Sequence, residues 1–187
     1  MRPHLITLAL VAVSPLHAMA APPADAADRI AAAPAAEDTR SAPAAKFAQP
    51  YDGVYAGGQP DARDLAQLHA QGVRTLIDLR ATSEDHGFDE AAEAARLGMA
   101  YVSLPIGKDD ISAGNADALQ ALLRQYGEGT LVHCASGNRV GALIALGAAR
   151  TGASREDALA LGRLAGLKSL EPVVAAQLDA ATAAPSK

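Results

Sequence analysis

The chain has 187 residues, enough for one medium-sized domain with a buried core and short of what two such domains usually need. Half of the residues are hydrophobic and only 3% are aromatic, and a formal net charge of -5 at pH 7 argues against nucleic acid or an anionic membrane as the main ligand. A single cysteine excludes an intramolecular disulfide.

Residues 1–20 have the pattern of a secretory signal peptide. Arg2 supplies the positive start, residues 5–13 form an apolar stretch too short to span a bilayer, and residues 18–20 form a small-residue cleavage site. We therefore predict a periplasmic or secreted protein with no stable membrane insertion after cleavage. Residues 21–46 are rich in alanine and proline and are predicted to be a disordered linker, which leaves residues 47–183 as the folded domain.

Within residues 47–183, apolar strand patterns alternate with helical ones. Strands are predicted at 53–56, 73–79, 99–104 and 130–133, and helices at 61–71, 89–97, 116–126, 140–149, 155–165 and 170–182, with 106–115 as a loop. The alternation predicts an α/β fold of three layers, with a four- to five-stranded, mostly parallel sheet and helices on both faces. Ligands of such sheets bind beyond the carboxyl ends of the strands, so the loops beginning at Arg80, Pro105 and Cys134 are expected to converge on one pocket.

The strongest functional signal is the segment from Thr130 to Arg150, which predicts a strand, a tight loop and a buried helix. This arrangement points backbone N–H groups and the positive end of the helix at one spot, where Cys134 lies, so the thiolate form of its side chain is expected to be favoured. Gly137 allows backbone angles that a Cβ would forbid. Arg139 can bind a tetrahedral oxyanion through two N–H groups, and its charge needs a partner in so apolar a helix. The pattern favours a nucleophile attacking an anionic substrate over a cysteine packed as a small hydrophobic residue.

The segment HCASGNRVG, with YAGGQP, DLR and YVSLPI upstream, resembles the cysteine-dependent phosphatases of the protein tyrosine/dual-specificity superfamily. Within that superfamily it is most similar to the bacterial beta-lactamase hydrolase-like phosphatase-like domain, over roughly residues 48–174. The resemblance implies a dual-specificity-phosphatase-like fold and hydrolysis of phosphate monoesters through a cysteinyl-phosphate intermediate. The substrate would be a phosphorylated protein (phosphotyrosine or phosphoserine) or a small phosphoester, and neither cofactor nor metal is expected.

The resemblance also implies roles for individual residues. Cys134 matches the nucleophile and Arg139 the phosphate-binding arginine, while the general acid falls on Asp109 or Asp110, between which the sequence does not choose. An aspartic acid suits this role because a departing alcohol or phenol needs a proton; a solvated loop charge or a helix cap is the alternative for this pair. The predicted substrate-binding residues are His133, Ala135, Ser136, Gly137, Asn138 and Arg80.

Two of these residues carry more specific expectations. His133 matches the residue that helps to set the geometry of the thiolate. Arg80 follows a buried strand, which would place its charge at the rim of the pocket; a surface salt bridge with Glu84 or Asp85 is the alternative.

Two other functions stay open. Arg139 follows Cys134 by five positions, whereas tyrosine phosphatases have six, and Val140 stands where a hydroxyl residue is usual. The shorter spacing is typical of rhodanese-type sulfurtransferases, which carry a persulfide on the cysteine, although Ala135 stands where those enzymes commonly have an arginine. The third possibility is a phospho-ligand binding module without turnover.

Overall fold

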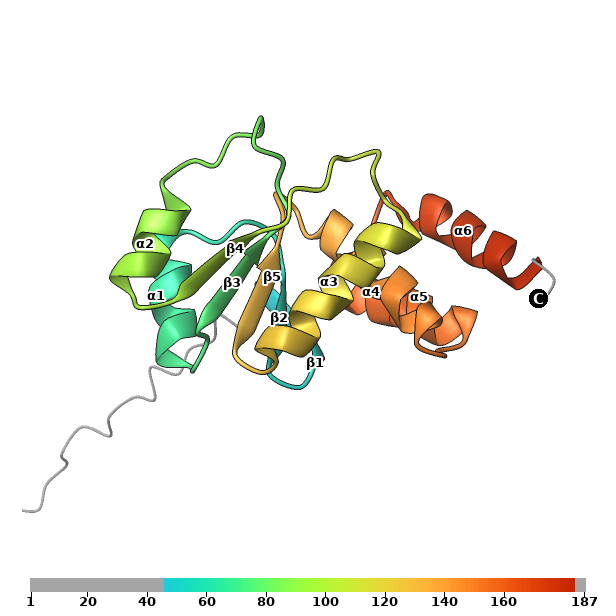
Figure 1. Ribbon diagram of the computed structural model, residues 1–187, viewed down its shortest axis with the longest axis horizontal. Helices are drawn as coiled ribbons and strands as arrows, with labels where there is room; N and C mark the ends of the chain where they lie inside the picture. The colour runs from blue at the N-terminus through green and yellow to red at the C-terminus, as the bar shows by residue number, and fades with distance from the viewer. Residues whose placement is uncertain (1–45, 184–187) are drawn as a thin grey trace, which may run out of the picture. The chain divides into compact units, whose positions relative to one another are not determined.

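The computed structural model describes residues 46–183 (Figure 1). The predicted signal peptide and residues 21–45 of the predicted linker therefore lie outside the described residues. The strands are β1 (Phe47–Tyr51), β2 (Val54–Gly57), β3 (Thr75–Asp78), β4 (Ala100–Ser103) and β5 (Thr130–His133). The helices are α1 (Ala62–Ala70), α2 (Glu90–Arg96), α3 (Ala113–Tyr126), α4 (Asn138–Arg150), α5 (Arg155–Leu164) and α6 (Glu171–Ala183).

The five strands form one sheet in the order β1-β2-β5-β3-β4, in which β1 is antiparallel to β2 and the other neighbouring strands are parallel. Figure 1 shows α1 and α2 on one side of the sheet and α3 to α6 on the other. The predicted three-layer α/β fold with a mostly parallel sheet is confirmed. The carboxyl ends of β2, β5 and β3 lie side by side, because Asp78 and Gly57 both pair in register with His133.

The central strands are apolar on both faces because each face packs against helices. Successive side chains of a strand point to opposite faces, so Leu76 and Leu131 lie in the cluster beneath α1 and α2, whereas Ile77 and Val132 lie in the larger cluster with α4. Helix α4 is buried around nearly its whole circumference. The strand and helix that flank Cys134 are thus anchored in the middle of the core.

Two elements differ from the sequence prediction. Strand β1 was not expected; it is an edge strand, which tolerates Pro50 because one side of an edge strand makes no ladder hydrogen bonds. Helix α3 begins at Ala113, three residues before the predicted start, because the Ser112 hydroxyl accepts the Asn115 N–H at 3.3 Å and caps the helix there.

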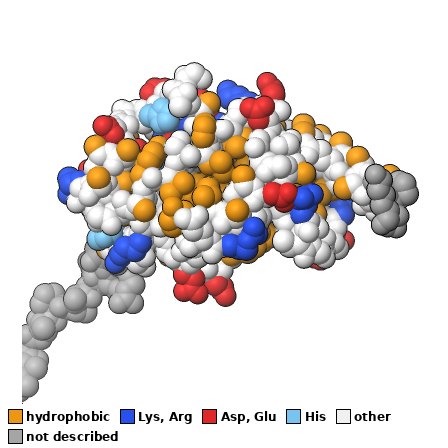
Figure 2. All heavy atoms as spheres, viewed as in Figure 1, with side chains coloured by type: hydrophobic (Ala, Val, Ile, Leu, Met, Phe, Trp, Pro, Cys, Tyr) orange, Lys and Arg blue, Asp and Glu red, His pale blue; other side chains and the backbone are white. Residues whose placement is uncertain are grey.

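The opposite edge strand, β4, is only partly covered. Its four residues are exposed or half-buried, and Figure 2 shows apolar side chains over the middle of this face, between α2 and α3.

Among the described residues, none of the helices combines the length and apolar character needed to cross a bilayer.

Candidate active site

Cys134 opens a four-residue turn between β5 and α4, here called the cysteine loop (residues 134–137). Gly137 closes the loop in the left-handed region, with φ +84°, and its N–H donates to Cys134 Sγ at 3.2 Å. A Cβ at Gly137 would lie 3.2 Å from the carbonyl carbon of Gly57, so β2 would have to shift by a few tenths of an ångström to admit a side chain. The loop is therefore held tightly against the end of β2, with a backbone donor aimed at the sulfur.

Arg139, in the first turn of α4, directly follows the cysteine loop and contacts the loops after β3 and β4. Its Nη1 donates to the carbonyl oxygens of Ile106 at 2.7 Å and Leu79 at 3.3 Å, which belong to the loops after β4 and β3. The loops after β3 and β4 thus meet the start of α4 at Arg139, although the loop after β3 lines no part of the hollow described below. Glu84 accepts from both terminal nitrogens, at 2.5 and 2.6 Å. Burial lowers the pKa of Arg139, but the Glu84 hydrogen bonds and the nearby Cys134 sulfur outweigh it and keep the guanidinium charged.

Glu84 is a site residue that the sequence prediction missed. The prediction required a partner for the Arg139 charge but did not identify it, and considered Glu84 only as a possible partner of Arg80. Hydrogen bonds from Arg139 lower the pKa of Glu84, so the pair is ionic at neutral pH. The signal available in the sequence was the need for compensation of a charge in an apolar helix.

A hollow of about 350 Å³ lies on the cysteine loop and is lined by Lys108, Ala135, Ser136, Asn138, Arg139, Ser169 and Leu170. Ala135 and Ser136 are exposed, whereas Cys134 is only 1% exposed and lies behind the loop. A ligand in the hollow thus meets the loop and Arg139 first.

Asn138 fixes one wall of this hollow. Its side-chain oxygen accepts the backbone N–H groups of Lys168 at 2.8 Å and Leu170 at 3.3 Å, and its Nδ2 donates to Ser169 Oγ at 2.7 Å. The connection between α5 and α6 is thereby tied to the start of α4. Asn138 shapes the site through this connection.

The two candidate general acids have different surroundings, although both are exposed. The Asp110 carboxylate accepts the Gly107 N–H at 3.2 Å, and its backbone carbonyl accepts from the Asn115 side chain at 2.6 Å, so Asp110 holds the loop together. Asp109 makes no side-chain hydrogen bond or ion pair to any residue in the part of the chain that the structure covers.

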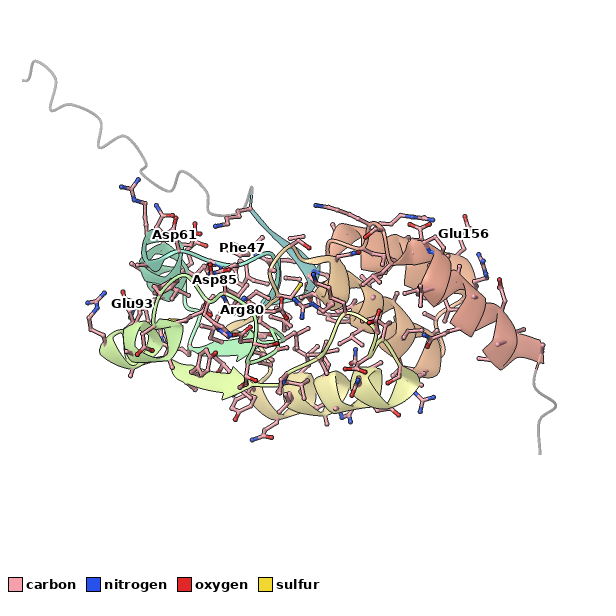
Figure 3. The ribbon with its side chains drawn as sticks, turned by 90° about the horizontal axis from the view of Figure 1, so that it is seen from above. Phe47, Asp61, Arg80, Asp85, Glu93 and Glu156 are labelled. Atoms are coloured by element: carbon pink, nitrogen blue, oxygen red, sulfur yellow. The ribbon has the colours of Figure 1, made fainter. Side chains whose placement is uncertain are left out.

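Arg80 is not at the pocket rim, and it makes no surface salt bridge with Glu84 or Asp85; both expectations for it are wrong. The side chain is fully buried and ion-paired with Asp78 and Glu90. Figure 3 shows Arg80 near the middle of the molecule, whereas Glu93 on α2 lies at its edge. A buried guanidinium needs carboxylate partners, and Asp78, at the end of a buried strand, supplies one two residues away.

His133 also belongs to this buried cluster. Its ring is fully buried, with Nε2 3.3 Å from Glu90 Oε1 and 3.9 Å from Asp78 Oδ1, so it does not contact substrate as the prediction placed it. The donor atoms of Asp78, Glu90 and His133 lie within 4.8 Å of one another, a spacing seen in metal sites. The guanidinium of Arg80 already holds both carboxylates, so we assign no metal to this cluster.

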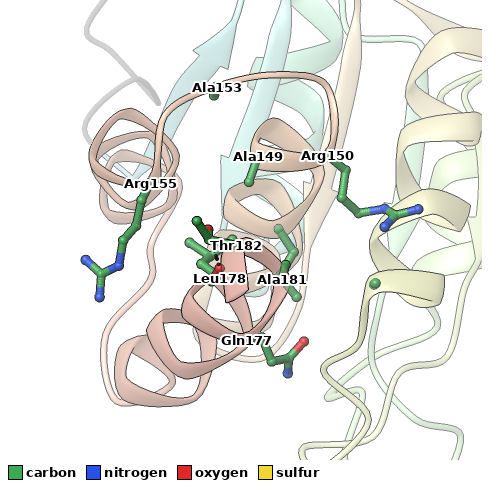
Figure 4. A pocket seen from close by; sticks show the side chains of 10 residues that line it. Ala149, Arg150, Ala153, Arg155, Gln177, Leu178, Ala181 and Thr182 are labelled. Carbon is green, nitrogen blue, oxygen red and sulfur yellow. Dashed lines mark hydrogen bonds between the residues drawn. The ribbon is translucent and has the colours of Figure 1, made fainter. Parts of the chain in front are cut away.

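A second hollow, of about 370 Å³, lies among α4, α5 and α6 (Figure 4). None of the predicted site residues lines it. Its two arginines, Arg150 and Arg155, are ion-paired with Asp117 and Asp179, so neither charge is available to hold an anion. Of these two hollows, the one on the cysteine loop is therefore the candidate site.

The chain is similar in sequence to known bacterial proteins. Two beta-lactamase hydrolase-like proteins, from Xylella fastidiosa strain Temecula1 and from Agrobacterium fabrum strain C58, are 33% and 30% identical over 114 and 99 residues, which is 58% and 51% of this chain. The chain spans only 26% and 23% of the length of these relatives.

Solved structures share the fold at low sequence identity. A Neisseria meningitidis protein is 18% identical with a TM-score of 0.60, covering 68% of this chain and 94% of its own. Tk-PTP in its active form is 16% identical with a TM-score of 0.58, covering 72% and 97%. The core catalytic domain of the S. cerevisiae PP-IP phosphatase is 15% identical with a TM-score of 0.54, covering 71% and 85%. The family model described as "Beta-lactamase hydrolase-like protein, phosphatase-like domain" matches residues 52–151, and the chain belongs to that family.

Proposed function

We propose that the protein is a cysteine-dependent phosphatase that hydrolyses phosphate monoesters through a cysteinyl-phosphate intermediate. The observation that carries the proposal is the position of Arg139, which lines the hollow on the cysteine loop and lies near Cys134. A phosphate entering the hollow would meet the guanidinium of Arg139, a group that binds phosphate oxygens in pairs, beside the loop that carries Cys134. The phosphatase-like family supports the same reaction class.

In the proposed reaction the Cys134 sulfur attacks phosphorus, and the bond from phosphorus to the ester oxygen breaks. The leaving oxygen takes a proton from Asp109, which we favour over Asp110 because the Asp110 carboxylate is engaged within its own loop. Water then attacks phosphorus and gives its proton to the Asp109 carboxylate while the phosphorus–sulfur bond breaks. Inorganic phosphate leaves, and the thiolate is restored.

We also propose that the enzyme acts in the periplasm or outside the cell, which is supported by the signal-peptide pattern of residues 1–20. In an oxidising compartment the thiolate is exposed to oxidation, against which the burial of Cys134 gives partial protection. Fractionation of cells expressing the full chain tests this: a shortened product in the periplasm or medium supports export, and a full-length product in the cytoplasm contradicts it.

The test of the reaction is a pair of assays on the full chain, one with an aryl phosphate and one with thiosulfate plus cyanide. We expect hydrolysis of the aryl phosphate, its loss in Cys134→Ser, and no sulfur transfer. Turnover in the assay with thiosulfate plus cyanide, with no hydrolysis of the aryl phosphate, would show that the protein is a sulfurtransferase. Phosphate binding without turnover in either assay would identify a binding module.

A further inference from the structure

The buried cluster behind the cysteine loop contains a pair of groups that the proposed reaction does not use. Glu90, in the first turn of α2, is only 2% exposed, and His133, at the end of β5, is fully buried. Glu90 Oε1 and both ring nitrogens of His133 are buried without a well-formed hydrogen bond. An unsatisfied buried polar atom is costly, so three in one place call for an explanation.

The remaining groups that face this pair are satisfied. Asp78 accepts the Arg80 backbone N–H at 2.9 Å, Arg80 Nε at 3.0 Å and Nη2 at 2.8 Å, and the Tyr101 hydroxyl at 2.8 Å. His86, from the loop before α2, lies 3.5 Å from the Asp78 carboxylate. Arg80 neutralises Asp78 and also holds Glu90 Oε2. Only Oε1 of Glu90 is left to interact with His133, with Nε2 3.3 Å away.

We propose that Glu90 is a positioning residue for Cys134: it shares a proton with His133 Nε2 and so determines which ring nitrogen of His133 carries the ring's own proton. A separation of 3.3 Å allows a hydrogen bond once a proton is placed between the two atoms. When Glu90 is a carboxylic acid, its O–H donates to a bare Nε2, and the ring proton is on Nδ1. When Glu90 is a carboxylate, it accepts from Nε2–H, and Nδ1 is bare. In the change from acid to carboxylate, the carboxyl proton passes to Nε2, the Nδ1 proton is lost, and one proton leaves the pair.

The change reaches the reacting sulfur because His133 and Cys134 are adjacent in the chain. Nδ1 is the ring nitrogen nearer the backbone, which continues directly into Cys134; burial lowers the pKa of His133, and the Cys134 backbone acts to raise it. Gain or loss of the proton on Nδ1 therefore alters the polar surroundings of the residue that carries the sulfur.

The ionisation of both groups supports this sharing near neutral pH. Burial raises the pKa of Glu90 to about 7, against the effect of Arg80. Burial lowers the pKa of His133 to about 4, so the ring is neutral at the pH where Glu90 titrates. When Glu90 ionises, the donor of the hydrogen bond thus changes from the Glu90 O–H to the Nε2–H of His133, and the imidazole stays neutral throughout.

The first test is nitrogen NMR of the ¹⁵N-histidine-labelled full chain, with His133 assigned by comparison with His133→Gln. We expect the ring proton of His133 to lie on Nδ1 at low pH and on Nε2 at high pH, with the midpoint of the change near pH 7. A ring that keeps one tautomer through this range, or that becomes an imidazolium at neutral pH, would overturn the proposal.

The second test uses Glu90→Gln, with Glu93→Gln, a half-buried residue of the same helix that pairs with Arg96, as the matched control. The glutamine carbonyl can accept from Arg80, which turns the amide N–H group toward Nε2 and mimics protonated Glu90 at every pH. We expect the His133 ring of Glu90→Gln to stay in the Nδ1–H form, while Glu93→Gln titrates like the wild type. If the ring proton of His133 still moved between Nδ1 and Nε2 with pH in Glu90→Gln, Glu90 would not be the group that controls the tautomer.

The link to Cys134 rests on the proposed role of that residue as the nucleophile, and alkylation by iodoacetate tests it without any substrate. Below pH 7 we expect Glu90→Gln and Glu93→Gln to be alkylated at equal rates. Above pH 7 the rates should differ by about threefold or more, the effect of one modest hydrogen bond. A rate ratio that does not change with pH would overturn the link. The alkylation measurement is independent of turnover, so absence of phosphatase activity would contradict the proposed function and leave this result unaffected.

Discussion

Glu84 holds the guanidinium of Arg139 with both carboxylate oxygens, at 2.5 and 2.6 Å, although the two residues are 55 positions apart in the chain. The remaining hydrogen bonds of Arg139 Nη1 go to the carbonyl oxygens of Leu79 and Ile106. The arginine that would bind phosphate is therefore oriented before any ligand arrives, and its orientation depends on two loops, the one after β3 and the one after β4.

Glu84→Gln should weaken this orientation while leaving the carbonyl contacts in place. A glutamine has one acceptor oxygen and no charge, so we expect kcat/KM for an aryl phosphate to fall about tenfold, the value of one charge-assisted hydrogen bond. Arg139 lowers the pKa of Glu84 below its ordinary 4.5, so its contribution to stability is present above that value and is lost only as the pH falls below it. Steady-state kinetics check the prediction, with Asp117→Asn, which breaks the exposed pair with Arg150, as the control. Equal activities of the two variants would show that Glu84 does not orient the site.

Arg139→Lys should cost more than Glu84→Gln. A lysine ammonium lacks the planar guanidinium, which holds Glu84 through Nη1 and Nη2 and keeps the Nε–H and the second Nη2–H for two phosphate oxygens. We expect kcat/KM to fall by about 100-fold or more, the range for removing a donor to a developing oxyanion. The matched control is Arg150→Lys at the other end of α4, which should retain wild-type kinetics. Near-normal activity of Arg139→Lys would exclude a two-pronged phosphate contact.

Gly137→Ala should disrupt the cysteine loop. Its φ of +84° is unfavourable for a residue with a Cβ, and the added atom would lie 3.2 Å from the Gly57 carbonyl carbon. We expect a loss of about 1–2 kcal/mol in the free energy of unfolding together with loss of turnover. Gly114→Ala, in α3 with open space at its Cβ position, should instead be neutral or stabilising. Urea denaturation of both variants measures the difference, and a Gly137→Ala protein as stable as Gly114→Ala would contradict the close approach.

The burial of Glu90 beside His133 should make the difference in the free energy of unfolding between Glu90→Gln and the wild type depend on pH. Between about pH 4.5 and 7 the unfolded chain ionises Glu90 while the folded protein keeps it protonated, so this residue makes the wild type less stable as the pH rises. The stability of Glu90→Gln relative to wild type should therefore rise across that window, by about 3 kcal/mol if the whole shift is expressed. Urea denaturation at a series of pH values is the measurement. Glu93→Gln should show a dependence of opposite sign, because Arg96 lowers the pKa of Glu93; a flat difference for Glu90→Gln would show that Glu90 is not protonated in the fold.

Much of the fold follows from local patterns in the sequence. Strands β3 and β5 and helix α4 are buried on nearly all sides, and their sequences consist mainly of apolar residues. Their positions can therefore be predicted from the sequence alone. Capping residues such as Asp61 and Ser154 mark helix starts for the same reason, because the cap hydrogen bonds are local. Strand β1 escaped prediction because it contains Pro50 and because, among the strands of residues 46–183, it pairs with β2 alone.

The site was predictable only where its residues are close in sequence. Cys134, Gly137 and Arg139 lie within one turn and its helix, so their spacing carries the geometry. Arg80 was misplaced because the direction of its side chain is decided by Asp78 and by Glu90 on another element, ten residues away. Such pairings depend on how α2 packs on the sheet, which no local pattern in one sequence records.

The most direct test of the proposed chemistry is mass spectrometry of the full chain, denatured rapidly while it turns over an aryl phosphate. The proposed mechanism predicts one added phosphoryl group, located by fragmentation on Cys134 and missing in Cys134→Ser. Turnover of the aryl phosphate by the Cys134→Ser protein, or a phosphoryl group carried on any other residue, would contradict the assignment of Cys134 as the nucleophile.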